Sequence, residues 1–360
     1  MDVAVNTRVV AFQIGGQQRV AAEVTKRLGA VAEIRPDRPL AGAQGHLWEQ
    51  FVLPLRARGR LLWSPSATGP LAYRRQVVTV HDVAFLDVPE CFSPSFRRVY
   101  AALVPALIRR VAKVVTVSEF SRRRILERVA VDPDKILVIG NGVGDQFRPQ
   151  DPGAVAATRA ALELPDRYVL VQATSDKRKN LARTLRAWRS ALSELPDDLW
   201  LVVSGNRDRA RVFGGADALE EVERTRFVGY VAEERLAPLI AGAEAFLFPS
   251  LYEGFGIPIL EAMACKTPVL TSDATATREI ADGNALLVDP ADEASIARGI
   301  VAVATDAALR ARLSALGPPH AAKFKWEDVA NRYRALFESL DGEAARSAFD
   351  DARRASRGLR

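Results

Sequence analysis

The chain has 360 residues, 48% of them hydrophobic and 26% charged, a mixture typical of a soluble protein long enough for two domains. No apolar run reaches the roughly 18 residues needed to span a bilayer. Two cysteines and three histidines exclude a disulfide scaffold and give no metal-ligand cluster. We see no secretion signal at the N-terminus and expect a protein of the reducing cytoplasm.

The net charge of +6 is unevenly distributed along the chain. Residues 1–150 carry 22 Lys and Arg against 13 Asp and Glu, a balance of +9, whereas the rest carries 28 against 31, a balance of −3. A positive first half suits an anionic partner, such as nucleic acid, phospholipid head groups or a phosphorylated substrate. The Arg- and Ala-rich composition of a GC-rich genome would give the same excess.

In the first half, short apolar runs alternate with helical segments. The first predicted strand is Val9–Ile14, and the amphipathic helix Gln17–Leu28 follows it. Further strands are predicted at Leu61–Trp63, Val77–Val80, Val114–Val117 and Ile136–Ile139, and helices at His46–Ala57, Ser95–Val111 and Glu119–Val129. Ser118 is a candidate N-cap, and Pro105 predicts that Ser95–Val111 divides into two shorter pieces.

The second half repeats the alternation. Strands are predicted at Tyr168–Ala173, Trp200–Ser204, Arg226–Val228, Ala245–Pro249, Pro268–Thr271 and Ala285–Val288. Helices are predicted at Leu181–Leu195, Glu233–Ala241, Ile257–Ala264, Thr275–Ile280, Glu293–Thr305 and Trp326–Leu340. Apolar strands that do not alternate, separated by helices, indicate parallel sheets covered on both faces.

Two such series predict an α/β protein made of two Rossmann-like, doubly wound domains. We place the first domain at residues 1–150 and the second at residues 151–325. A helix at residues 326–341, which we expect to pack back toward the first domain, and a charged, Ala-rich tail at residues 342–360 complete the chain. Ligands of such domains bind beyond the carboxyl ends of the strands, here between the two domains.

The string EGFGIPILE at residues 253–261 is the strongest functional signal. A strand ends just before it, a loop carries Gly254, Phe255 and Gly256, and a helix begins at Ile257. Backbone N–H groups at such a glycine-bearing helix start can approach a diphosphate closely, and the helix dipole favours its charge. The carboxylates of Glu253 and Glu261 can accept hydrogen bonds from sugar hydroxyls.

A second cluster, SDKRKNL at residues 175–181, also follows a strand and precedes a helix. Its cations Arg178 and Lys179, with Asn180 beside them, suit a diphosphate and the charge that develops on it as it departs. In the first half, His81 ends an apolar strand and is followed by Asp82. Gly15–Gly16 after the first strand and Asn141 in IGNGV could also face the ligand, although simple turns explain both about as well.

These motifs resemble glycosyltransferase family 4, a group of retaining enzymes with the GT-B fold of two facing Rossmann-like domains. The E-x7-E motif of the family matches Glu253 and Glu261, and its R-K-N motif matches Arg178, Lys179 and Asn180. The resemblance implies that Glu253 and His81 contact the transferred sugar, that Lys179 binds phosphate and that Glu261 binds the nucleotide ribose. It extends over roughly residues 8–340.

The sequence departs from the family at two places. Many relatives have an arginine just after the strand that precedes the R-K-N motif, where this chain has Ala173–Thr174–Ser175; Arg207 could supply that charge. Relatives usually have glycine after EAMAC, where this chain has Lys266. A non-glycine residue in a left-handed helix cap costs on the order of 1 kcal/mol.

Two further features have competing interpretations. Asp132–Pro133–Asp134 resembles the metal-binding Asp-x-Asp of other glycosyltransferases, but a turn and a cap explain it better, so we expect no metal cofactor. The segment Ser95–Val111, with Arg97, Arg98, Arg109 and Arg110, could be a basic amphipathic helix that contacts anionic membrane, or a helix with one face in the core.

The hypothesis is a metal-independent hexosyltransferase that uses a nucleotide-diphosphate sugar, with GDP-mannose favoured. The acceptor would be a lipid-diphosphate-linked or polysaccharide glycan, as for similar mannosyl- and rhamnosyltransferases of O-antigen and exopolysaccharide assembly. Alternatives are rhamnosyl, glucosyl or GlcNAc transfer from GDP-, dTDP- or UDP-sugars, a GT-B epimerase or phosphorylase, and a non-catalytic basic binding protein. We expect no nucleic-acid partner, since no recognised motif is present. We expect a cytoplasmic location, either free or peripheral to the inner face of the membrane.

Overall fold

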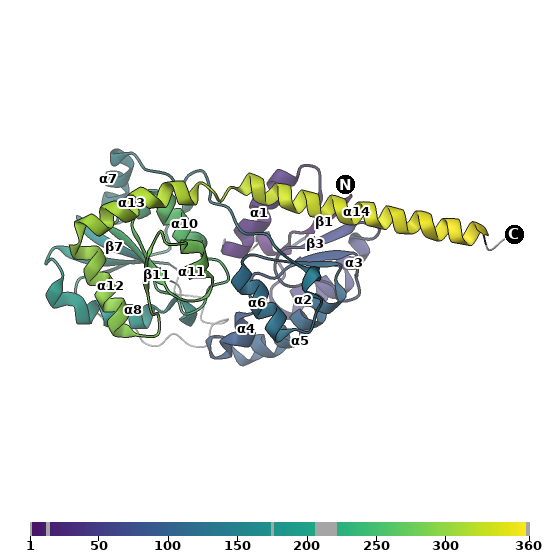
Figure 1. Ribbon diagram of the computed structural model, residues 1–360, viewed down its shortest axis with the longest axis horizontal. Helices are drawn as coiled ribbons and strands as arrows, with labels where there is room; N and C mark the ends of the chain where they lie inside the picture. Colours follow the sequence, from purple (N-terminus) through teal and green to yellow (C-terminus); the bar gives the residue numbers. More distant parts are fainter. Residues whose placement is uncertain (1, 12–14, 174–175, 206–221, 358–360) are drawn as a thin grey trace.

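The computed structural model describes residues 2–11, 15–173, 176–205 and 222–357, with side chains as far as residue 342. Its described strands form two six-stranded sheets that are parallel throughout, each flanked by helices (Figure 1). Most strand residues are buried, as expected when helices cover both faces of a parallel sheet.

The first sheet has the strand order β2-β1-β3-β4-β5-β6. Its strands are β1 (Val3–Asn6), β2 (Ala32–Ile34), β3 (Leu61–Ser64), β4 (Gln76–Thr79), β5 (Lys113–Thr116) and β6 (Ile136–Val138). Its helices are α1 (Gly16–Leu28), α2 (Gly42–Phe51), α3 (Leu53–Arg56), α4 (Ala84–Asp87), α5 (Pro94–Arg110) and α6 (Glu119–Arg128).

The second sheet has the order β12-β11-β10-β7-β8-β9, the strand order of the Rossmann fold. Its strands are β7 (Arg167–Gln172), β8 (Leu199–Ser204), β9 (Thr225–Gly229), β10 (Ala245–Phe248), β11 (Val269–Ser272) and β12 (Leu286–Val288). Its helices are α7 (Pro152–Ala161), α8 (Leu181–Ala191), α9 (Glu233–Ala241), α10 (Ile257–Ala264), α11 (Thr275–Ala281), α12 (Glu293–Thr305) and α13 (Ala307–Ala321).

The predicted first strand, Val9–Ile14, is wrong. The strand is Val3–Asn6, which pairs with both β2 and β3 and is wholly buried, whereas Arg8–Ala11 forms a 3-10 turn. The predicted break at Pro105 is also wrong, because α5 runs unbroken through it. Burial of Val104, Leu107 and Ile108 on either side of the proline compensates for the hydrogen bond that it cannot donate.

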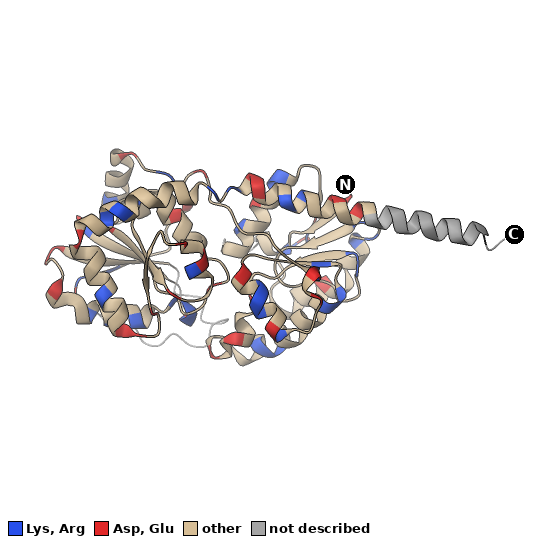
Figure 2. Cartoon of the chain, in the orientation of Figure 1, with Lys and Arg blue, Asp and Glu red and all other residues tan. Residues whose placement is uncertain are grey.

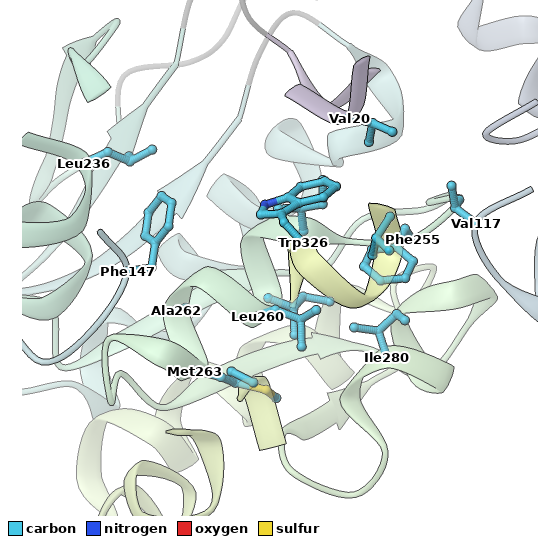
Figure 3. Close-up of a cluster of buried hydrophobic side chains, with 14 of the residues drawn as sticks. Val20, Val117, Phe147, Leu236, Phe255, Leu260, Ala262, Met263, Ile280 and Trp326 are labelled. Atoms are coloured by element: carbon cyan, nitrogen blue, oxygen red, sulfur yellow. The ribbon is translucent and has the colours of Figure 1, made fainter. Parts of the chain in front are cut away.

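The two domains share one apolar cluster (Figure 3). Val20 of α1 and Val117 after β5 come from the first domain, and Leu260 of α10 comes from the second. Phe255 lies against Gly140, where an added Cβ would be 3.2 Å from its ring. The buried Trp326 belongs to the same cluster, so the domain interface is partly a continuous hydrophobic core.

The last helix, α14 (Trp326–Arg357), returns to the first domain and is much longer than the predicted Trp326–Leu340. The ring of Trp63 on β3 lies 4.9 Å from that of Tyr333 and 5.9 Å from that of Phe337. The Tyr333 hydroxyl is 3.0 Å from the Thr79 hydroxyl. Beyond these contacts, the last turns of the helix extend past the first domain (Figure 1).

Candidate active site

The site lies at the switch point of the second sheet, where β7 and β10 are neighbours and the strand order reverses. Loops at the carboxyl ends of these two strands carry Lys179 and Glu253. The Lys179 Nζ donates a hydrogen bond of 2.7 Å to the Glu253 Oε1 and lies 4.7 Å from the centre of the Phe248 ring. Both side chains are about four-fifths buried or more. A positive group and a negative group that could each bind part of a ligand are therefore already held in place here.

The loop after β7 owes its shape to Asn180. Its backbone is left-handed, with φ of 59°, and its side-chain amide donates to the carbonyls of Pro249 and Pro290. Asn180 thus ties the Lys179 turn to the loop that follows β10. Its predicted role in direct donor binding stays a prediction, since both amide hydrogen bonds in the structure serve the protein.

Arg178 faces the first domain. Its guanidinium makes a paired contact with Asp176, lies 3.7 Å from the Asp82 Oδ2 and stacks 5.1 Å from the centre of the Phe92 ring. Although burial disfavours its charge, Asp176, Asp82 and Glu253 raise the Arg178 pKa above its ordinary value. The cation therefore links the two domains beside Lys179.

The loop at 253–256 approaches the first domain so closely that residue 254 must be glycine. A Cβ at Gly254 would lie 2.5 Å from the His81 carbonyl oxygen. The Gly254 carbonyl accepts hydrogen bonds from the hydroxyls of Ser118 and Ser121. Gly256 has φ of +108°, a conformation that favours glycine, and α10 begins at the next residue.

His81, at the carboxyl end of β4, is buried, and its Nε2 lies 2.9 Å from the Pro65 carbonyl. A carbonyl only accepts, so Nε2 carries the proton and Nδ1 is left as an acceptor. Burial lowers the pKa of His81 below its usual value, although the Pro65 carbonyl and Asp82 oppose this. A neutral imidazole suits hydrogen bonding to a sugar hydroxyl.

Glu261 lies inside α10 and is 2% exposed. Its Oε1 accepts a hydrogen bond from Arg19 of α1, and the other terminal nitrogen of Arg19 lies 3.3 Å from the Glu233 Oε1. Burial raises the pKa of Glu261 to about 7; Arg19 acts against this rise and Glu233 adds to it. The carboxylate that the family motif assigns to ribose therefore already has a cationic partner from the first domain.

The remaining predicted residues are placed as follows. Gly15 precedes α1, and its N–H donates to the Gln18 side chain, while Gly16 opens the helix. Asn141 is 4% exposed, and among the described residues its buried Oδ1 has no hydrogen-bond partner, so its predicted role at the ligand stays a prediction. Arg207 lies outside the described residues.

Two local predictions are confirmed. Lys266 follows the end of α10 with φ of 67°, the left-handed geometry predicted for the position where relatives have glycine. Asp132 caps the turn Pro133–Lys135 by accepting from the Asp134 N–H. In the part of the chain that the structure describes, no three His, Cys, Asp or Glu side chains are grouped so that they could hold a metal ion.

Sequence reasoning missed the partners that come from the opposite domain. Arg19 reaches Glu261 over 242 positions of sequence, and the carboxylate of Glu279 accepts from the N–H groups of Glu119 and Phe120 at the start of α6. A lone arginine or glutamate on a helix carries no local pattern, so these contacts had no signal apart from the nearness of Arg19 to Gly15–Gly16.

Comparison with known proteins agrees with this geometry. The model of group 1 glycosyl transferases matches residues 157–318, and that of glycosyltransferase family 4 matches residues 59–147. The chain is 30% identical to O-antigen chain mannosyltransferase B of Escherichia coli over 280 residues, 74% of this chain and 72% of that protein. It is 27% identical to the serotype-specific mannosyltransferase WbdA of Escherichia coli over 71% of this chain, but spans only 32% of that longer protein.

Among solved structures, HepE of Anabaena, in complex with UDP and glucose, superposes with a TM-score of 0.74 at 16% identity, over 94% of this chain and all of that one. The fold is therefore GT-B, as predicted. The chain belongs to the group 1 and family 4 glycosyltransferases. It is a hexosyltransferase, and the E-x7-E and R-K-N residues lie at the switch point of its second domain.

Proposed function

We propose that this enzyme transfers mannose from GDP-mannose to a hydroxyl of a lipid-linked or polysaccharide glycan, with retention of the anomeric configuration. The observation that carries the proposal is the Lys179–Glu253 pair at the switch point, beside the glycine-led start of α10. The names of the E. coli relatives support mannose and an O-antigen type of acceptor. The resemblance to family 4 supports retention, a donor held mainly by the second domain, and independence from metal.

In this proposal each site residue binds a different part of the donor. The Lys179 ammonium and the N–H groups at the start of α10 bind the diphosphate. Glu253 leaves its partner Lys179 and accepts from hydroxyls of the sugar, while Nδ1 of His81 accepts from another. Glu261 accepts from the ribose. Gly15 and Gly16 lie at the first-domain side of the donor, and Arg178 supplies further positive charge.

The reaction follows from this placement. The bond between the anomeric carbon and the phosphate oxygen breaks, and the acceptor hydroxyl bonds to that carbon from the face that the phosphate leaves. The hydroxyl proton passes to the departing phosphate oxygen. Positive charge from Lys179 stabilises the leaving diphosphate, and this stabilisation is the main contribution of the protein to the rate.

The acceptor would approach from the basic first domain, and we include peripheral contact with anionic membrane in the proposal. Leu47, Phe51 and Leu55 repeat at intervals of four along α2 and α3 and are 58%, 68% and 72% exposed. Exposed Arg56 and Arg58 follow them. An apolar stripe beside arginines suits an anionic lipid surface. No helix in the described part of the chain is both long enough and apolar enough to cross a membrane.

The proposal is tested by Lys179→Ala and Glu253→Gln in a donor scan with GDP-mannose, UDP-glucose, UDP-GlcNAc and dTDP-rhamnose. We expect each variant to lower kcat/KM by at least about a hundredfold, because loss of a preorganised charge at a developing anion costs roughly 3 kcal/mol. Unchanged melting temperature and circular dichroism establish that the fold is intact.

Glu244→Gln is the matched control, because Glu244 is also ion-paired, with Arg167 at 2.6 Å, but lies at the start of β10 instead of its end. It should keep near-normal turnover. Near-normal kcat/KM in Lys179→Ala or Glu253→Gln would refute the site. Formation of an epimer of the donor without any acceptor would favour the epimerase alternative, and salt-sensitive RNA binding without donor affinity would favour a basic binding protein.

A further inference from the structure

Arg19 is the one described cation of the first domain that is hydrogen-bonded to the E-x7-E motif. It lies in the first turn of α1, three residues after the helix begins at Gly16. Its side chain is 17% exposed, and that of Glu261 is 3% exposed. Burying a charge pair between two domains carries a desolvation cost that the attraction between the two charges need not repay.

The surroundings hold the guanidinium between two carboxylates and an aromatic ring. Glu261 and Glu233 accept from its two terminal nitrogens, and the Phe147 ring centre is 5.7 Å from its carbon Cζ. Glu233 is in turn bonded to the Gln146 side-chain amide at 3.1 Å. Arg19 is thus the charge that offsets the burial of Glu261.

Arg19 is also related to the proposed diphosphate site through its partner Glu261. Glu261 follows the helix cap Gly256 by five residues, which is about 7.5 Å along the axis of α10. An arginine side chain can swing over that distance. The second domain lacks an arginine directly after β7, since the sequence there is Ala173–Thr174–Ser175, and Arg19 could supply a guanidinium in its place.

We propose that Arg19 is a donor-binding residue contributed by the first domain, which exchanges Glu261 for the diphosphate when the nucleotide sugar binds. In the ligand-free chain it neutralises Glu261. When the ribose hydroxyls take over the Glu261 carboxylate, the guanidinium turns to the diphosphate and forms charge-assisted hydrogen bonds with it. In this exchange Arg19 links the first domain to the second through Glu261 before the nucleotide binds, and through the bound diphosphate afterwards. This inference rests on the proposed function.

The test compares GDP with guanosine, which has the ribose and base but no phosphate, by calorimetric titration of the full chain. In Arg19→Ala we expect the Kd for GDP to rise by at least about tenfold, since a hydrogen bond to a charged group contributes about 1.5–3 kcal/mol. At a pH well above 7, where Glu261 stays ionised, the Kd for guanosine should stay equal or fall, because Glu261 no longer has a competing partner. Arg19→Lys, which keeps the charge, should restore part of the GDP affinity.

Arg27→Ala is the matched control. Arg27 lies two turns further along α1 and is ion-paired with Glu23 and Glu327, away from α10, so both ligands should bind as to the wild type. Equal weakening of GDP and guanosine in Arg19→Ala, or unchanged GDP binding, would overturn the role of Arg19. If the wild type transferred no sugar and bound no nucleotide, the proposed function itself would fail.

Discussion

At the scale of single residues, the two glutamates of the E-x7-E motif have unlike environments. Glu253 is paired with Lys179 and 14% exposed on its side chain, whereas Glu261 is enclosed and faces Arg19, Glu233 and Cys265. The placement of both in the loop and helix that follow β10 was predictable, because the motif is local. Their separation into a lysine-paired and a buried carboxylate was not, because it depends on Arg19, 242 positions away in the sequence.

The pKa of Glu261, raised to about 7 by burial, predicts a pH dependence of nucleotide binding. Below pH 7 the carboxyl is protonated and can no longer accept from both ribose hydroxyls. We expect the Kd for GDP to rise several-fold when calorimetric titrations move from pH 8 to pH 6, and Glu261→Gln to bind weakly at both values. His81 should not contribute, because its pKa is lowered. An equal pH response in Glu261→Gln would contradict the assignment.

At the scale of elements, sequence patterns located most of the strands and the loop–helix junctions that form the site. The helix start at Ile257 and the N-cap Ser118, which accepts from the Ser121 N–H, are confirmed. Both signals lie within a few residues of the element they define. The strand β1 was misplaced, because Val9–Ile14 is as apolar as Val3–Asn6, and only pairing with β2 and β3 selects between them.

The end of α10 gives a stability prediction. Because Lys266 holds φ of 67°, Lys266→Gly should raise the free energy of unfolding by up to about 1 kcal/mol, as glycine adopts this conformation without strain. Arg312→Gly, at an exposed position inside α13, should lower it by about 1 kcal/mol. Urea unfolding followed by circular dichroism measures both. A loss of stability in Lys266→Gly would contradict the cap interpretation.

At the scale of the whole molecule, the segment for which membrane contact was considered, Ser95–Val111, does not carry the most exposed apolar residues. The helix α5, which covers this segment, buries its apolar face at Val104, Leu107 and Ile108. This agrees with the second of the two interpretations, a helix with one face in the core. Acidic and basic residues are interspersed along the helices of both domains (Figure 2). The stripe Leu47–Phe51–Leu55 on α2 and α3 is therefore the better candidate for lipid contact.

A flotation assay tests this surface with vesicles of phosphatidylglycerol and phosphatidylcholine. Replacing Leu47, Phe51 and Leu55 with serine should reduce the vesicle-bound fraction at least about tenfold, since each inserted side chain contributes on the order of 1 kcal/mol or more. Tyr230→Ser removes an exposed ring, 67% accessible, from the second domain and should bind as the wild type does. Equal binding of the triple variant and the wild type would exclude this stripe.

The return of α14 to the first domain affects how the chain matures during synthesis. Trp63 is fully buried, yet Tyr333 and Phe337, which cover it, are translated some 270 residues later. Until then Trp63 stays uncovered on one side of the first sheet. Chaperones bind such exposed apolar surface, and chains can misassemble through it. The domain that leaves the ribosome first is thus the last to be completed, and its folding waits for the second domain to be made.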